Sequence, residues 1–297
     1  MKAFLILEDG TVFTGTSIGS AREAVSEIVF NTSMTGYLEV LTDPSYAGQA
    51  VVMTYPLIGN YGICYDDMES ARPWPDGFIV RELSRLPSNF RCEDTIQNFL
   101  EKNDIPGISG IDTRALTKIL REKGTMNGMI TTREYEDLEE PISRIKAYSV
   151  KGVVKATSCK EKYVLEPEDS KLQEPVRRVA LLDLGAKKNI ARSLVERGCE
   201  VTVYPCDTPA EEILASCPDG IMLSNGPGDP KENTEIIREI RKLYESCYRD
   251  NLHSLWAGQE LYRKGNSEEE FMNILQKNMQ PVYDSARRQG YEVWNRG

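Results

Sequence analysis

Hydrophobic and polar positions alternate over short distances in the first 130 residues of the chain. Residues 1–7 and 11–15 flank Asp9-Gly10, a dipeptide typical of hairpin turns. Residues 50–54 form an apolar, β-branched run of strand length. The pattern predicts strands and turns, with one or two helices among them.

Helical spacing of apolar residues is strongest over 112–123. Asp112 or Thr113 can cap that helix and Gly124 can end it. Weaker patterns predict short helices at 95–103 and 141–147.

From residue 176 the pattern changes to regular alternation of strands and helices. This spacing predicts a parallel sheet with helices on its faces, which binds ligands at the carboxyl ends of its strands. The loop 224–230, SNGPGDP, follows the third strand and lies at such an end. We predict strands at 179–183, 200–204 and 220–224, and helices at 188–197, 210–216 and 234–244.

The tail after the third helix breaks this alternation. Ser267 and Glu270 form a capping box ahead of apolar residues at helical spacing, and a second helix is predicted over 282–288. We therefore predict an α/β chain with four regions. These are an N-terminal mixed α/β domain over 1–150, a charged linker over 151–175, a partial parallel-sheet domain over 176–246 and an atypical helical tail over 247–297.

The charge balance is acidic, with 36 Lys and Arg against 46 Asp and Glu and a net charge of −10. This balance argues against nucleic acid or an anionic membrane as the main partner. No apolar run reaches the roughly 18 residues of a membrane helix, and the N-terminus does not resemble a signal peptide. We expect a cytoplasmic protein.

Seven cysteines are scattered without a C-x-x-C pair, so free thiols in a reducing compartment are expected. No His or Cys residues have zinc-ligand spacing, and we expect no metal site. His253 is the single histidine, which restricts nucleophilic catalysis because most such sites use a His base.

Three loops are rich in residues that could hold a small polar ligand. Residues 30–36 and 42–49 are dense in hydroxyls, and Asp43-Pro44 can start a turn. The glycines of 224–230 would expose backbone groups to an amino acid's polar ends. Taken alone, each loop is better explained as a structural turn.

Together these segments resemble the small, glutamine-using subunit of carbamoyl phosphate synthase. The resemblance runs in order from residue 1 to about 246. It rests on FNTSMTGYLEVLTDPSYAGQ (30–49), TYPLIGNYG (54–62), GISGIDTRALTKILREKGTMNGMI (107–130), LLDLGAKKNI (181–190) and LSNGPGDP (223–230).

The resemblance implies an N-terminal small-subunit domain that docks on the large subunit. It implies a second, flavodoxin-like domain of the class I glutamine amidotransferases, incomplete here. In that family a Cys–His–Glu triad releases ammonia from glutamine for carbamoyl phosphate synthesis, in arginine and pyrimidine biosynthesis. ATP and Mg²⁺ belong to the large subunit, and this chain itself is expected to hold no cofactor. By resemblance, Ser45, Gly226 and Gly228 contact glutamine.

The catalytic elbow of that family is absent from this sequence. No Cys has glycines two residues away on both sides, and family spacing places Ser254 at the nucleophile position. We therefore predict no catalytic residues, and a small subunit in truncated or altered form. Two alternatives remain open: a non-catalytic subunit that stabilises the large subunit, and a non-functional truncated product.

Overall fold

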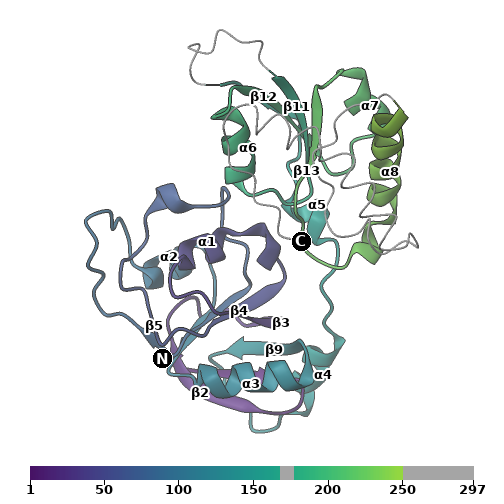
Figure 1. Cartoon of the computed structure of the whole chain (residues 1–297). Helices are drawn as coiled ribbons and strands as arrows, with labels where there is room; N and C mark the ends of the chain where they lie inside the picture. The colour runs from purple at the N-terminus through teal and green to yellow at the C-terminus, as the bar shows by residue number, and fades with distance from the viewer. Residues whose placement is uncertain (168–176, 250–297) are drawn as a thin grey trace, which may run out of the picture.

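A computed structural model describes residues 1–167 and 177–249, which form two units (Figure 1). The first unit is built on a closed barrel with strand order β1-β2-β8-β6-β4-β3-β9. Parallel and antiparallel pairs both occur in it, so the prediction of a mixed α/β unit is confirmed. Its strands are β1 (Lys2–Leu7), β2 (Val12–Ser17), β3 (Ala24–Asn31), β4 (Gln49–Met53), β6 (Gly77–Ile79), β8 (Gly107–Ser109) and β9 (Met126–Thr131).

The predicted N-terminal hairpin is present, with β1 and β2 paired antiparallel around Gly10. β1 is buried along both faces because a different helix packs against each face. Leu5 and Leu7 pack in a cluster with Leu116 of α3 (Thr113–Lys123), whereas Phe4 and Ile6 pack with Ile145 of α4 (Glu139–Ala147).

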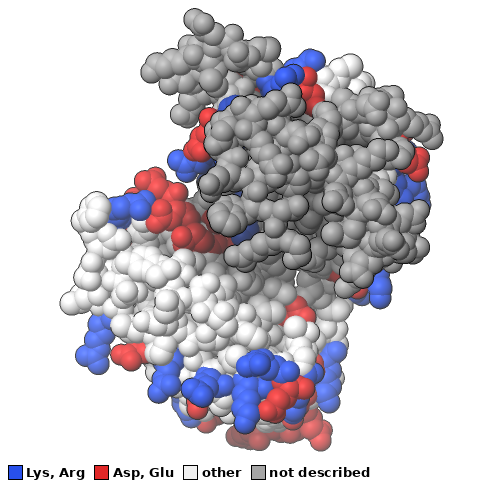
Figure 2. All heavy atoms as spheres, viewed as in Figure 1, with Lys and Arg blue, Asp and Glu red and all other residues white. Residues whose placement is uncertain are grey.

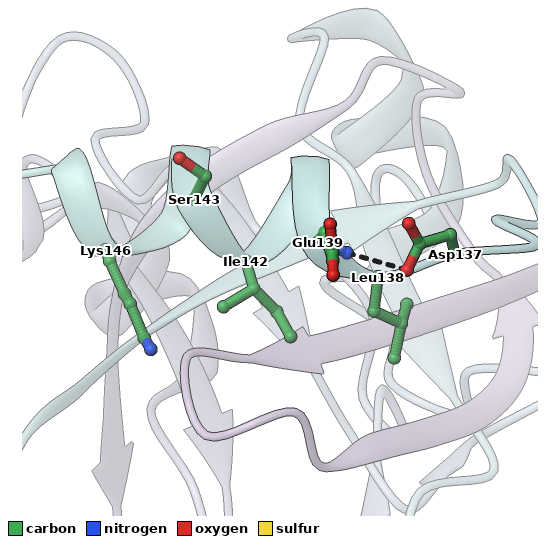
Figure 3. A pocket seen from close by; sticks show the side chains of 6 residues that line it. All are labelled: Asp137, Leu138, Glu139, Ile142, Ser143 and Lys146. Carbon is green, nitrogen blue, oxygen red and sulfur yellow. Dashed lines mark hydrogen bonds between the residues drawn. The ribbon is translucent and has the colours of Figure 1, made fainter.

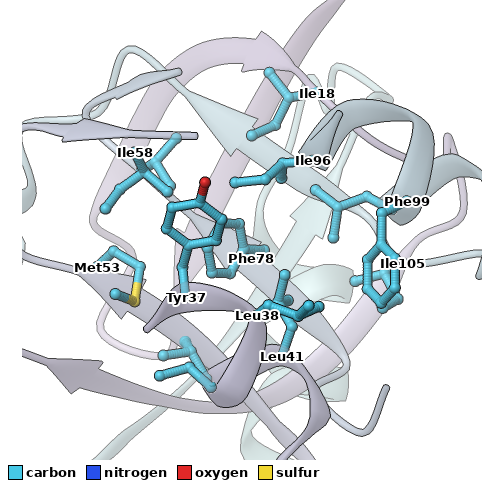
Figure 4. Close-up of a cluster of buried hydrophobic side chains, with 14 of the residues drawn as sticks. Ile18, Tyr37, Leu38, Leu41, Met53, Ile58, Phe78, Ile96, Phe99 and Ile105 are labelled. Carbon is cyan, nitrogen blue, oxygen red and sulfur yellow. The ribbon is translucent and has the colours of Figure 1, made fainter. Parts of the chain in front are cut away.

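A helix that the sequence analysis missed, α1 (Tyr37–Thr42), lies on the other side of the barrel with α2 (Ile96–Lys102). Tyr37, Leu38 and Leu41 are buried in one apolar cluster with strand and α2 residues (Figure 4). This anchoring fixes the segment that follows, the 3₁₀ helix η1 (Pro44–Tyr46). Nearby lie a two-stranded sheet of β5 (Leu57–Ile58) and β7 (Glu82–Leu83), and the 3₁₀ helix η2 (Tyr65–Asp67).

The second unit is a four-stranded sheet of order β10-β12-β11-β13. Three strands are parallel in the order second, first, third, which is how a flavodoxin-like sheet begins. Its elements are α5 (Val153–Thr157), β10 (Tyr163–Leu165), β11 (Arg177–Asp183), α6 (Lys188–Val195), β12 (Cys199–Pro205), α7 (Ala210–Ala215), β13 (Gly220–Leu223), η3 (Pro230–Asn233) and α8 (Thr234–Arg249).

Side chains of β11 alternate between the two faces of this sheet. Val179 and Leu181 pack in a cluster with Ala191 of α6, whereas Ala180 and Leu182 pack with residues of α7 and α8. Figure 1 shows α6 on one face and α7 with α8 on the other. The helices predicted around this sheet are therefore present on both faces.

Part of the stretch predicted as a linker, 151–175, differs from that prediction. α5 packs on the second unit through Val154, and β10 pairs antiparallel with β12. The sequence pattern did not predict β10, because this strand pairs through only three residues and charged residues lie around it. The wider domain boundaries remain a prediction, and the helices predicted after residue 250 lie outside the described residues.

Candidate functional site

The carboxyl ends of β11 and β13 lie side by side, and the loops that leave them are joined by one serine. Ser224 is buried, and its hydroxyl accepts a hydrogen bond from the Leu184 amide (2.9 Å) and donates one to the Asn225 carbonyl (2.7 Å). The two loops therefore form one unit at the end of the sheet where such folds bind ligands.

Asp183, the last residue of β11, orders the first of these loops. One carboxylate oxygen accepts from the amides of Gly185 (2.9 Å) and Ala186 (2.7 Å), and the other from the Cys159 amide (2.7 Å). Burial and the nearby Asp183 charge raise the pKa of the Cys159 thiol to about 12. Because the thiolate is the reactive form of cysteine, this raised pKa argues against Cys159 as a nucleophile.

Gly226 and Gly228 bring the second loop closer to its neighbours than other residues could. A Cβ on Gly226 would lie 2.4 Å from the Leu184 carbonyl oxygen. Gly228 has φ of +79°, and a Cβ there would lie 2.6 Å from Val153 Cγ2. Both glycines are also exposed to solvent.

Ser45 belongs to the first unit, yet the structure brings it to this loop. Asp43 caps η1, its carboxylate accepting from the Ser45 amide at 2.9 Å. The Ser45 hydroxyl then accepts a hydrogen bond of 3.1 Å from Asn225 Nδ2. All three residues predicted to contact glutamine therefore lie on two adjoining segments.

The two units meet around this contact through further polar pairs. Lys187 forms a 2.7 Å ion pair with Asp43. Glu69 accepts from the Lys188 amide through its carbonyl (2.7 Å) and from Asn189 Nδ2 through one carboxylate oxygen (3.1 Å). Burial alone would lower the pKa of Lys187, but the hydrogen bond and charge of Asp43 outweigh burial and raise it. Lys187 therefore stays cationic.

The sequence analysis did not single out Asp43, Lys187 or Asn225 as parts of the site. All three lie inside the motifs TDPSY, GAKKN and SNGPG. For Asp43 and Asn225 the available signal was their place one or two residues from the predicted contacts Ser45 and Gly226, whereas Lys187 offered no such signal. Pairing between them depends on tertiary structure, which the sequence pattern does not show.

The structure does not describe the position at which family spacing places the nucleophile. Cys247 falls near the end of α8, and His253 and Ser254 lie outside the described residues.

Within 1–167 and 177–249, no group of three or more His, Cys, Asp or Glu could hold a metal ion. No helix in those ranges is long and apolar enough to cross a membrane.

A separate surface depression lies over α4 on the barrel (Figure 3). None of the predicted site residues belongs to it, and its open, mixed lining shows no convergent set of polar groups. It is lined by Asp137, Leu138, Glu139, Ile142, Ser143 and Lys146.

Two protein families match consecutive parts of the chain. "Carbamoyl-phosphate synthase small chain, CPSase domain" matches residues 5–130, and "Glutamine amidotransferase class-I" matches residues 180–252. The second match covers both loops of the site. Barrel, sheet and matches together define an amidotransferase-type chain with a small-subunit domain ahead of it.

Curated relatives agree with both matches. Carbamoyl phosphate synthase small chains from Clostridium perfringens and Syntrophotalea carbinolica are 52% and 44% identical to this chain, respectively. The alignments cover 82% and 89% of this chain, and 67% and 74% of those relatives. The chain belongs to the carbamoyl phosphate synthase small chain family.

The chain is shorter than these relatives. It spans 64% of the small chain from Oceanobacillus iheyensis, to which it is 50% identical over 82% of its own length. A solved aminopeptidase from Aneurinibacillus sp. strain AM-1 matches 74% of this chain and 56% of its own at 11% identity. Its TM-score of 0.28 is too low to bear on the fold.

Proposed function

We propose that this chain binds L-glutamine at the junction of its two units and acts as a small subunit without glutaminase activity. The observation that carries the proposal is the 3.1 Å contact between Ser45 and Asn225. It places a hydroxyl from the barrel beside the exposed glycines Gly226 and Gly228. These groups suit a zwitterionic amino acid, because a few converging polar groups can fix both of its charged ends.

The proposed absence of glutaminase activity rests on the chemistry that these 297 residues offer. Amide hydrolysis of this kind needs a thiolate and a base, and triad members act as a unit. No cysteine has the glycine setting of the family's elbow, and the single His253 precedes Leu255 by two residues where the family has a glutamate. Cys159, close to the site, keeps its proton at neutral pH.

The proposed partner is the large subunit, which would hold ATP and Mg²⁺ and carry out the synthesis in the cytoplasm. The barrel offers a surface for docking, since Figure 2 shows few charged side chains over the face around β5. Leu57 of β5 is partly exposed, and Leu86 and Phe90 are 82% and 98% exposed. Contiguous exposed apolar side chains are typical of interaction surfaces, and we propose that these three residues form part of one.

Two other functions remain as alternatives. The chain could stabilise a large subunit that uses free ammonia and have no role for glutamine. It could also be a non-functional product, in which case it would bind neither partner nor ligand.

Reconstitution separates a working small subunit from the non-functional product, and binding of L-glutamine to the chain then separates the proposed function from the subunit that only stabilises its partner. The full chain is co-expressed with a carbamoyl phosphate synthase large subunit, and carbamoyl phosphate is measured with ATP, bicarbonate and either ammonium or glutamine. We expect co-purification and synthesis from ammonium but not from glutamine. Synthesis from glutamine would contradict the predicted loss of catalysis, and failure to co-purify would favour the non-functional product.

A further inference from the structure

The Asp43 carboxylate bonds two groups that belong to different units of the molecule. One oxygen accepts from the Ser45 amide at 2.9 Å, and the other accepts from Lys187 Nζ at 2.7 Å. The side chain of Asp43 is 11% exposed and that of Lys187 is 37% exposed. The ion pair is therefore largely shielded from solvent on the Asp43 side, where charge-assisted hydrogen bonds are strong.

Ser45 is fixed within the first unit by the anchoring of α1 and η1, and the hydrogen bond from Asn225 to its hydroxyl joins it to the second unit. Ser45 lies in a 3₁₀ helix of three residues, and its hydroxyl contact with Asn225 involves an exposed amide side chain. Lys187 starts from the loop that Asp183 orders at the end of β11. A chain of contacts thus runs from the sheet through Lys187 and Asp43 to the backbone of Ser45.

We propose that Asp43 is a positioning residue that uses its ion pair with Lys187 to hold Ser45 against the 224–229 loop, and so sets the affinity of the site for glutamine. This inference rests on the proposed function for the identity of its ligand. The positioning of Ser45 by Asp43 and Lys187 does not depend on that ligand. Lys187 acts through Asp43, because its Nζ pairs with the Asp43 carboxylate.

The barrel contains a matched control for this arrangement. Asp9 accepts from the Thr11 amide two residues ahead (2.9 Å) and from Lys123 Nζ (2.6 Å), which repeats the geometry of Asp43. The Asp9 pair joins the β1–β2 turn to α3, within the first unit. Asp9→Asn and Lys123→Met therefore remove an equivalent ion pair elsewhere.

The first test measures the affinity of the full chain for L-glutamine by calorimetry. We expect Asp43→Asn and Lys187→Met each to weaken binding by about tenfold, the equivalent of one charge-assisted hydrogen bond. The double variant should be no weaker than either single one, because both changes break the same contact. Asp9→Asn and Lys123→Met should bind as the unaltered chain does, and melting temperatures report whether each variant folds.

The second test needs no ligand and measures hydrogen exchange of the Ser45 amide by NMR. Lys187→Met should speed that exchange by about tenfold, although Lys187 does not touch Ser45, whereas Lys123→Met should not. Unchanged exchange in Lys187→Met would overturn the inference. Full glutamine affinity in Asp43→Asn would also overturn the inference, provided that Ser45→Ala abolishes binding in the same assay. If the unaltered chain binds no glutamine, the proposed function fails and the exchange result alone decides this inference.

Discussion

Gly226 lies against the backbone of the neighbouring loop, where a side chain has no space. A Cβ at this position would meet the Leu184 carbonyl oxygen at 2.4 Å, and a carbonyl in a loop fixed by Asp183 and Ser224 cannot move away easily. At the residue scale the site is thus defined by close backbone approach as much as by the Ser45 hydroxyl.

The change Gly226→Ala should therefore displace the 224–229 loop. We expect a loss of about 1 to 3 kcal/mol in the free energy of unfolding and a clear loss of glutamine affinity. Gly220→Ala in β13 is the matched control, because a Cβ there meets nothing within 4 Å. Urea unfolding and calorimetry measure the two effects, and equal behaviour of the two variants would contradict this explanation.

Two half-buried groups predict how stability depends on pH. The pKa of Cys159 rises from 9.0 to about 12 through burial and the Asp183 charge, and that of Tyr148 from 10.0 to about 12 through burial and Asp76. Both groups are neutral when protonated, and the folded state holds the proton more tightly. Their stabilisation is complete below about pH 9 and is lost as the pH rises toward 12.

We therefore expect the free energy of unfolding to fall between pH 9 and pH 11. The free energy of unfolding of Cys159→Ser, which removes one of these titrating groups, should fall less steeply with pH than that of the unaltered chain in urea titrations. Cys217→Ser changes an exposed thiol and serves as the control. An identical slope in Cys159→Ser and in the unaltered chain would refute the assignment.

At the element scale, α5 is the segment whose role the sequence pattern did not show. Strands and helices with clear periods, such as β11 and α3, were predicted within a few residues because burial of one face dictates their spacing. α5 has five residues and β10 has three, too few to establish a period. Only contacts with distant residues, such as Val154 with Cys206 and Ile236, determine where they lie.

Val154→Ala tests whether α5 is part of the second unit. Val154 is 5% exposed in a cluster with Cys206 and Ile236, so removing two methyl groups should cost about 1 to 3 kcal/mol. Val164→Ala, at a position 52% exposed in the same stretch, should cost much less. Thermal unfolding followed by circular dichroism compares the two variants. A negligible loss of stability in Val154→Ala would instead support the predicted linker over 151–175.

At the scale of the whole molecule, the site exists only where the two units meet. Ser45 and Asn225 are 180 residues apart in the sequence. The family resemblance predicted that both regions serve one ligand, but the ion pair of Asp43 with Lys187 and the Glu69 contacts could be found only in three dimensions. These polar pairs hold barrel and sheet together around the predicted ligand position.

Docking on a large subunit also belongs to this scale. Phe90→Asp changes a side chain that is 98% exposed, so it should leave stability unchanged and weaken co-purification with the large subunit. Val12→Asp, at a partly exposed position of β2, is the control. Equal recovery of both variants with the large subunit would contradict a docking surface at this loop.

Titration of the full chain with L-glutamine tests the central claim most directly, with glutamate release followed in the same samples by mass spectrometry. We predict binding at one site, loss of that binding in Ser45→Ala, unchanged binding in Ser88→Ala at an exposed serine, and no glutamate above the buffer control. Glutamate release that depends on Ser45 would contradict the predicted loss of catalysis. Absence of binding would contradict the assignment of the site itself.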